Sequence, residues 1–132
     1  MKRDILVALY SEDPYVLDWM SLLIVRDWRT RVIGEASTPS ELTDILTQEH
    51  FHGDVIVIDL DNISDLRKAG KEINYATTPL KAIGLCRKQR LEFFKQIPEF
   101  SIAGLLYKDE IETSLGWAIT FVAEGKPVYT PK

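Results

Sequence analysis

The sequence predicts an α/β fold: a doubly wound, five-stranded parallel sheet with five helices. Strand-like and helix-like segments alternate along the chain, which is typical of parallel βαβ units. The third strand-like run, residues 55–58, is apolar at every position, as expected for a strand buried on both faces in the middle of a parallel sheet. The 132 residues are 45% hydrophobic, which is enough for the core of one compact domain.

The strands and helices are each predicted from local patterns. Runs of aliphatic and β-branched residues predict the strands, and apolar residues at three- and four-residue intervals between them predict the helices. The predicted strands cover residues 5–10, 31–36, 54–59, 81–86 and 102–107. The predicted helical stripes are Val16, Met20, Leu23 and Ile24; Leu42, Ile45 and Leu46; Leu66, Ala69 and Ile73; Leu91, Phe94 and Ile97; and Ile111, Leu115, Ala118 and Val122.

Helix boundaries carry their own signals. Asp13 followed by Pro14 predicts the start of the first helix, and a capping box from Thr38 to Glu41 predicts the start of the second. The third helix, within residues 63–73, is the weakest because it contains a glycine. Pro98 ends the fourth helix and Gly125 the last.

Composition predicts one domain, residues 1–125, followed by a tail or linker of residues 126–132 that contains two prolines. The single cysteine excludes a disulfide within the chain, which favours a reducing compartment. No signal-peptide pattern opens the chain, and no apolar run approaches the roughly 20 residues of a membrane span. We therefore expect a soluble, cytoplasmic protein. A net charge of −4 with scattered basic residues argues against direct binding of nucleic acid by this domain.

Asp59 is the best single candidate for a functional group. It follows the apolar strand, at the edge of an open α/β sheet where ligands bind. A second interpretation, that Asp59 merely caps a turn, stays open at this point.

The order of these pieces resembles a CheY-like receiver domain of a two-component response regulator, of the NarL/FixJ type, over essentially the whole chain. No single piece is specific, but all occur in the right order and spacing. They are Ser11-Glu-Asp-Pro14, Val32-Ile-Gly-Glu-Ala-Ser37, Asp54-Val-Ile-Val-Ile-Asp-Leu60, Gly104-Leu-Leu-Tyr-Lys-Asp109 and the segment Ala118 to Gly125.

The resemblance implies a phosphorylation site with a weakened metal site. Asp59 matches the phospho-accepting aspartate, with a histidine kinase as the implied partner, and Lys108 matches the lysine that pairs with the phosphoryl oxygens. Receivers place two adjacent acids before the first helix to hold Mg²⁺, and here those positions are Ser11 and Glu12. We therefore expect Mg²⁺ to bind weakly, through Glu12 and Asp59. Asp61 is either a further acid of this site or a turn acid. An alternative register, in which Glu12 and Asp13 form the acidic pair, requires a gap.

The switch positions also depart from the family. The Ser or Thr that ends the fourth strand is replaced by Cys86, and the aromatic residue of the fifth strand by Leu105. A thiol is a weak donor and leucine has no polar tip, so the relay from hydroxyl to ring is predicted to be absent. Arg87 either pairs with Asp59 or Asp61 in place of a metal or points to solvent.

The predicted function is that of an atypical receiver rather than an enzyme. The NarL/FixJ resemblance implies control of transcription through a separate helix-turn-helix output domain that contacts DNA. The alternative is a phosphatase, because Asp59-Leu-Asp61 resembles the Asp-x-Asp motif of haloacid-dehalogenase phosphatases. That motif normally opens its chain, whereas here it lies near the middle.

Four aromatic residues predict a homodimer. Tyr15 and Trp19 lie one turn apart in the first helix, as do Trp117 and Phe121 in the last, outside the predicted apolar stripes. Exposed aromatic residues on neighbouring helices are typical of interfaces, and NarL/FixJ relatives suggest such a dimer. The alternative is that Trp117 folds over the rim of the core and Trp19 is half-buried.

Overall fold

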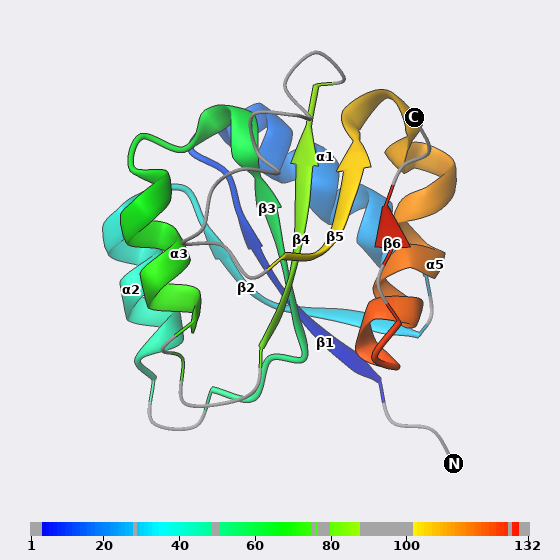
Figure 1. Cartoon of the computed structure of the whole chain (residues 1–132), viewed down its shortest axis with the longest axis horizontal. Coiled ribbons are helices and arrows are strands. Elements are labelled where there is room, and N and C mark those ends of the chain that lie inside the picture. The colour runs from blue at the N-terminus through cyan, green and yellow to red at the C-terminus, as the bar shows by residue number, and fades with distance from the viewer. Residues whose placement is uncertain are drawn as a thin grey trace.

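A computed structural model describes residues 4–27, 29–48, 51–74, 76, 80–87, 102–126 and 128–129 (Figure 1). One parallel sheet has the strand order β2-β1-β3-β4-β5-β6, so the chain winds outward from the centre in both directions. The strands are β1 (Ile5–Tyr10), β2 (Thr30–Ala36), β3 (Val55–Asp59), β4 (Lys81–Cys86), β5 (Ile102–Tyr107) and β6 (Val128–Tyr129). The described α-helices are α1 (Pro14–Val25), α2 (Pro39–Leu46), α3 (Leu66–Asn74) and α5 (Ile111–Ala123), with 3-10 turns at Leu60–Asn62 and Lys108–Glu110.

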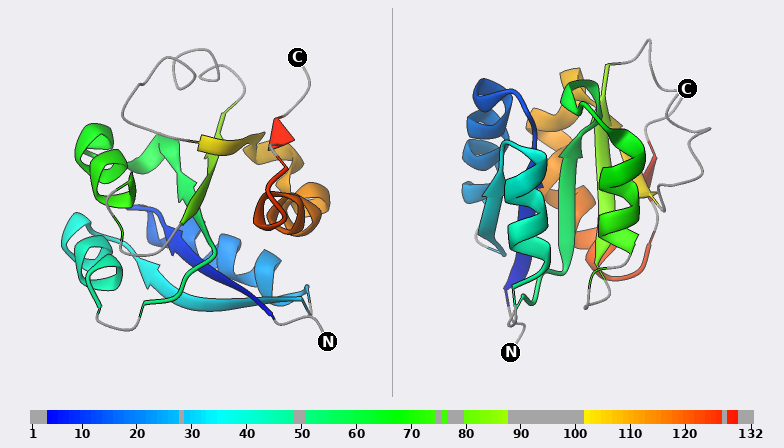
Figure 2. Two further views of the ribbon diagram at one scale, coloured as in Figure 1. Left: turned by 60° about the horizontal axis from the view of Figure 1, so that its bottom comes forward. Right: turned by 90° about the vertical axis from the view of Figure 1, so that its left-hand side faces the viewer.

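The helices form two layers, with α1 and α5 on one face of the sheet and α2 and α3 on the other (Figure 2). Alternate residues of each strand enter alternate cores, because side chains point to opposite faces of a strand. In β3, for example, Val55 and Val57 pack against α1 and α5, whereas Ile56 and Ile58 belong to the core beside α2 and α3. The predicted doubly wound α/β fold is confirmed.

The local sequence signals place the described helices and strands close to their observed bounds. Asp13 accepts a hydrogen bond from the Tyr15 N–H and caps α1, and the Thr38 side chain accepts from the Glu41 N–H at the start of α2. Two buried residues were missed, Leu17 in α1 and Ile119 in α5, because each buried face is wider than the predicted stripe. The predicted fourth helix, residues 91–97, lies outside the described residues.

The predicted tail contains a short strand. α5 ends before Gly125, whose φ of +89° is readily adopted only by a residue without a side chain, and the chain then turns back along the sheet. Val128 pairs with Gly104 and Tyr129 with Leu105, which adds β6 to the edge of β5. The expectation of a linker missed this strand because two residues are too few to show an alternating pattern. No helix within the described ranges is long and apolar enough to cross a membrane.

Candidate functional site at the carboxyl end of β3

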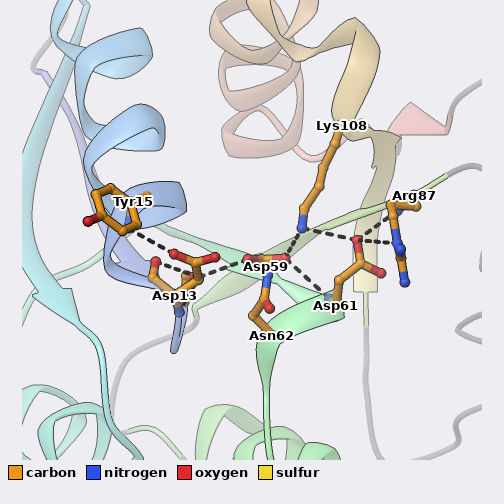
Figure 3. Close-up of polar contacts among 8 residues, drawn as sticks. Asp13, Tyr15, Asp59, Asp61, Asn62, Arg87 and Lys108 are labelled. Carbon is orange, nitrogen blue, oxygen red and sulfur yellow. Dashed lines mark hydrogen bonds and ion pairs between the residues drawn. The ribbon is translucent and has the colours of Figure 1, made fainter.

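Asp59 is fully buried at the carboxyl end of β3, between β1 and β4. Its carboxylate accepts hydrogen bonds from the Ser11 hydroxyl at 2.8 Å, the Asn62 side-chain amide at 2.6 Å and the Asp61 N–H at 3.2 Å. It also forms an ion pair with Lys108 (Figure 3). Asp59 therefore caps the 3-10 turn, as in the second interpretation, and also belongs to a charged cluster; its role as the functional group stays a prediction.

Lys108 joins the two acids that the sequence singled out. It follows β5, and its ammonium group lies between the carboxylates of Asp59 and Asp61, 3.0 Å from the Asp61 oxygen (Figure 3). Arg87 approaches Asp61 from the far side: its backbone N–H donates to Asp61 at 2.9 Å, and its Nε lies at 3.9 Å. The guanidinium is largely exposed, so this second ion pair is weakened by solvent. Among the residues that the structure describes, these two carboxylates and two cations have formal charges that sum to zero.

The two carboxylates before α1, those of Glu12 and Asp13, bond to groups other than Asp59. Glu12 instead accepts hydrogen bonds from the Tyr10 hydroxyl at 2.6 Å, from the Ser64 N–H at 3.0 Å and from the Ser64 hydroxyl at 3.2 Å. Asp13 caps α1. In this structure the Glu12 and Asp13 carboxylates thus bond to groups other than Asp59, and weak Mg²⁺ binding through Glu12, or through the pair of Glu12 and Asp13, stays a prediction.

Tyr10 explains where Glu12 lies. Burial, and then the Glu12 carboxylate, raise the pKa of the Tyr10 phenol well above its ordinary value, so the hydroxyl keeps its proton and donates to Glu12. The long glutamate side chain turns towards this donor. Sequence reasoning missed Tyr10, Asn62 and Ser64, and only Asn62, in the turn after β3, had a local signal.

As arranged, the donor set does not fit Mg²⁺. This ion prefers octahedral oxygen ligands, usually one or two carboxylates with waters or phosphate oxygens. Here the two carboxylates beside Lys108 share its positive charge, and a hydroxyl stands where an acid was expected. Within the described part of the chain, no group of three or more histidine, cysteine, aspartate or glutamate side chains is placed to hold a metal ion.

The two switch positions lie in the core beside α2 and α3. Cys86 ends β4, Leu105 lies in β5, and both are buried. Neither side chain carries a hydroxyl or a ring. The absence of a polar relay between them stays a prediction, because it concerns a second state of the molecule.

The four aromatic residues fall into two groups. Tyr15 is 86% exposed, and Trp117 and Phe121 are 43% and 41% exposed, with their rings edge to face at 5.2 Å. Trp19 is instead half-buried against the core beside α1 and α5, as in the alternative interpretation. Sequence reasoning missed the exposed Leu22, two helical turns after Tyr15 on the same face of α1.

This doubly wound sheet, covered by α1 and α5 on one face and α2 and α3 on the other, is the fold of CheY-like receiver domains. Solved structures similar to this chain include receivers of RcsB and NarL. No family model matches the sequence, and neither does any curated protein. The likeness therefore rests on the three-dimensional structure.

Three solved structures illustrate the likeness. The non-phosphorylated receiver domain of RcsB from Escherichia coli has a TM-score of 0.81 at 20% identity, over 98% of this chain and 100% of that one. The receiver domain of NarL from Mycobacterium tuberculosis has a TM-score of 0.77 at 16% identity, over 95% and 100%. A structure of two RcsB dimers bound to two parallel DNAs has a TM-score of 0.80 at 20% identity, over 97% of this chain, which spans 65% of that RcsB chain.

Proposed function

We propose that this chain is an atypical receiver domain in two-component signalling, and not an enzyme. It passes a signal by docking to itself, to a histidine kinase or to an output domain, with phosphorylation weak or dispensable. The observation that carries the proposal is the ion pair of Asp59 with Lys108 at the carboxyl edge of a receiver-type sheet.

The proposed chemistry is phosphoryl transfer to Asp59. A carboxylate oxygen attacks the phosphorus of a phosphohistidine, the bond from phosphorus to nitrogen breaks, and Lys108 stabilises the negative charge on the transferring group. Three hydrogen bonds and the Lys108 ion pair already engage this carboxylate, which lowers its reactivity. With Glu12 held by Tyr10 and Ser64, we propose that any Mg²⁺ is bound weakly.

A phosphoryl mimic tests this proposal. We expect acetyl phosphate or beryllofluoride with Mg²⁺ to modify Asp59 slowly, and amide shifts to stay close to Asp59 without reaching Leu105, because the hydroxyl and ring of the relay are absent. Asp59→Asn is the control. Large amide shifts around Leu105, or saturation at the metal concentrations usual for receivers, would show a competent switch instead.

A phosphatase is the alternative of a different class. Its Asp-x-Asp motif would be Asp59-Leu-Asp61, but both acids here are paired with Lys108. Sustained turnover of a generic phosphoester with Mg²⁺, lost in Asp59→Asn, would favour that activity.

Control of transcription through an attached or partner domain is part of the same proposal. The RcsB structures include complexes with DNA in which this chain corresponds to about two thirds of the RcsB chain. By analogy, we propose that DNA is contacted by a separate output domain. The chain's acidic balance, with a net charge of −4, agrees with this division of roles.

We also propose a homodimer through α1 and α5. The two helices pack together on one face of the sheet, and both expose apolar side chains: Tyr15 and Leu22 on α1, and Trp117 and Phe121 on α5. Exposed aromatic groups on adjacent helices are enriched in interfaces, and a second copy presents the same surface to itself under two-fold symmetry.

Sedimentation tests the dimer. At about 50 μM, on the order expected for a weak interface, we expect wild type to contain dimers, and Trp117→Glu and Tyr15→Glu to be monomeric, because each buries a charge in the interface. Ser40→Glu adds the same charge to an exposed position of α2 on the opposite face and should leave the dimer intact. If all four proteins sediment as identical monomers, this surface is not a dimer interface.

A further inference from the structure

Ser11 occupies the position at which a carboxylate would make this site require a cation. The residue is fully buried, and its hydroxyl lies 2.8 Å from the Asp59 carboxylate. A hydroxyl donates a proton to the carboxylate and so stabilises its negative charge, whereas a second carboxylate at that distance repels it. With Ser11 present, the charges of Lys108 and Arg87 equal in number those of Asp59 and Asp61, counted over the described residues of this cluster.

Glu12 is held away from the site by contacts on two sides. Its backbone N–H donates to the Asn62 carbonyl at 2.9 Å, and its carboxylate accepts from the Tyr10 and Ser64 groups. Tyr10 is itself buried in the core, so a turn of Glu12 towards Asp59 would leave a buried hydroxyl without this acceptor. Glu12 therefore fastens the loop before α1 to the turn after β3.

We propose that Ser11 makes this site independent of divalent cations, with Lys108 as its permanent internal cation and Glu12 as a structural clamp. This proposal rests on the proposed receiver function and specifies how the same site is regulated. The conformation around Asp59 is then independent of the Mg²⁺ concentration. The Ser11 side chain alone determines this independence.

The test compares thermal unfolding of three proteins with and without MgCl₂. They are wild type, Ser11→Asp and Ser11→Asn, of which the last two differ only in charge and share nearly the same shape. In Ser11→Asp, the added carboxylate faces Asp59, and Mg²⁺ relieves their repulsion. We expect about 10 mM MgCl₂ to raise its melting temperature by about 4 °C, as for a site with a dissociation constant of ~1 mM.

The melting temperatures of wild type and Ser11→Asn in MgCl₂ are expected to differ by less than about 1 °C from those in NaCl of equal ionic strength. Asp59→Asn in the Ser11→Asp protein should abolish the Mg²⁺ response, which places the ion at this site. A wild type whose melting temperature rises as much as that of Ser11→Asp overturns the proposal. If Ser11→Asp does not fold without the ion, a rise of about 4 °C in the wild type by itself overturns the proposal.

The outcome is separable from the proposed function. A wild type that responds to Mg²⁺ refutes the role of Ser11 and the weak metal binding, and leaves the assignment of the chain as a receiver standing. Phosphoester turnover that persists without Mg²⁺ would refute the receiver proposal and leave the Mg²⁺ comparison of the Ser11 variants unchanged.

Discussion

Lys108→Met is expected to lower the free energy of unfolding by about 3–5 kcal/mol, the usual loss when one partner of a buried ion pair is removed. Asp59 is fully buried and Asp61 nearly so, and the Lys108 ammonium group lies between them. Without it, both carboxylates stay buried, and the remaining ion pair described here, with Arg87, is largely exposed to solvent. Denaturant unfolding followed by tryptophan fluorescence measures the loss.

Lys126→Met is the matched control for Lys108→Met. Lys126 pairs with Glu124 at 3.7 Å on the exposed end of α5, so the change should stay within about 0.5 kcal/mol. Asp61→Asn in the Lys108→Met protein should restore part of the lost stability, because one unbalanced charge is removed. A loss below about 1 kcal/mol for Lys108→Met would show that the site does not depend on its internal cation.

Gly84→Val is expected to lower the free energy of unfolding by about 2 kcal/mol, because the valine side chain overpacks the core. This net loss already includes the small stabilisation that comes from the strand preference of valine. A Cβ atom at Gly84 would lie 2.5 Å from a methyl group of Leu60 and 3.2 Å from one of Leu105. Both leucines are buried, so neither moves freely. Leu60 lies between Asp59 and Asp61, and its displacement should therefore shift the amide signals of the site as well as lower stability.

Gly34→Val is the control for Gly84→Val. A Cβ atom there would lie 3.2 Å from Ile45, which is only partly buried, so the loss should be smaller. Leu60→Ala makes room for the valine, and the double variant should lose less stability than the two single losses added together. Additive losses would mean that Leu60 is not the obstructing group.

The sequence by itself determined the framework of the fold. All five predicted strands are present in the structure, and their bounds lie within one residue of the predicted ones. An apolar run bounded by turn residues is a local signal that can be recognised in the sequence. The caps at Asp13 and Thr38 are equally local. Asp59 was found for the same reason, since the end of a buried parallel strand can be recognised along the chain.

Only the tertiary structure decided which partner each polar group takes. Ser11 bonds to Asp59 across 48 residues and Glu12 to Ser64 across 52, and nothing in either segment indicates these pairs. A glutamate side chain is long enough to turn towards Asp59 or towards Tyr10. The choice depends on a buried hydroxyl that needs an acceptor once the sheet has formed.

The tertiary structure also decided which side chains are exposed and which strand lies at the edge of the sheet. Periodicity placed Tyr15 and Trp19 on one helical face, but the packing of α1 beside α5 exposes the first and half-buries the second. β6 joins the sheet through backbone hydrogen bonds, which any two residues other than proline can form beside an open edge. Local patterns therefore determined the elements, whereas contacts between distant segments decided the charge balance of the site and the shape of its surroundings.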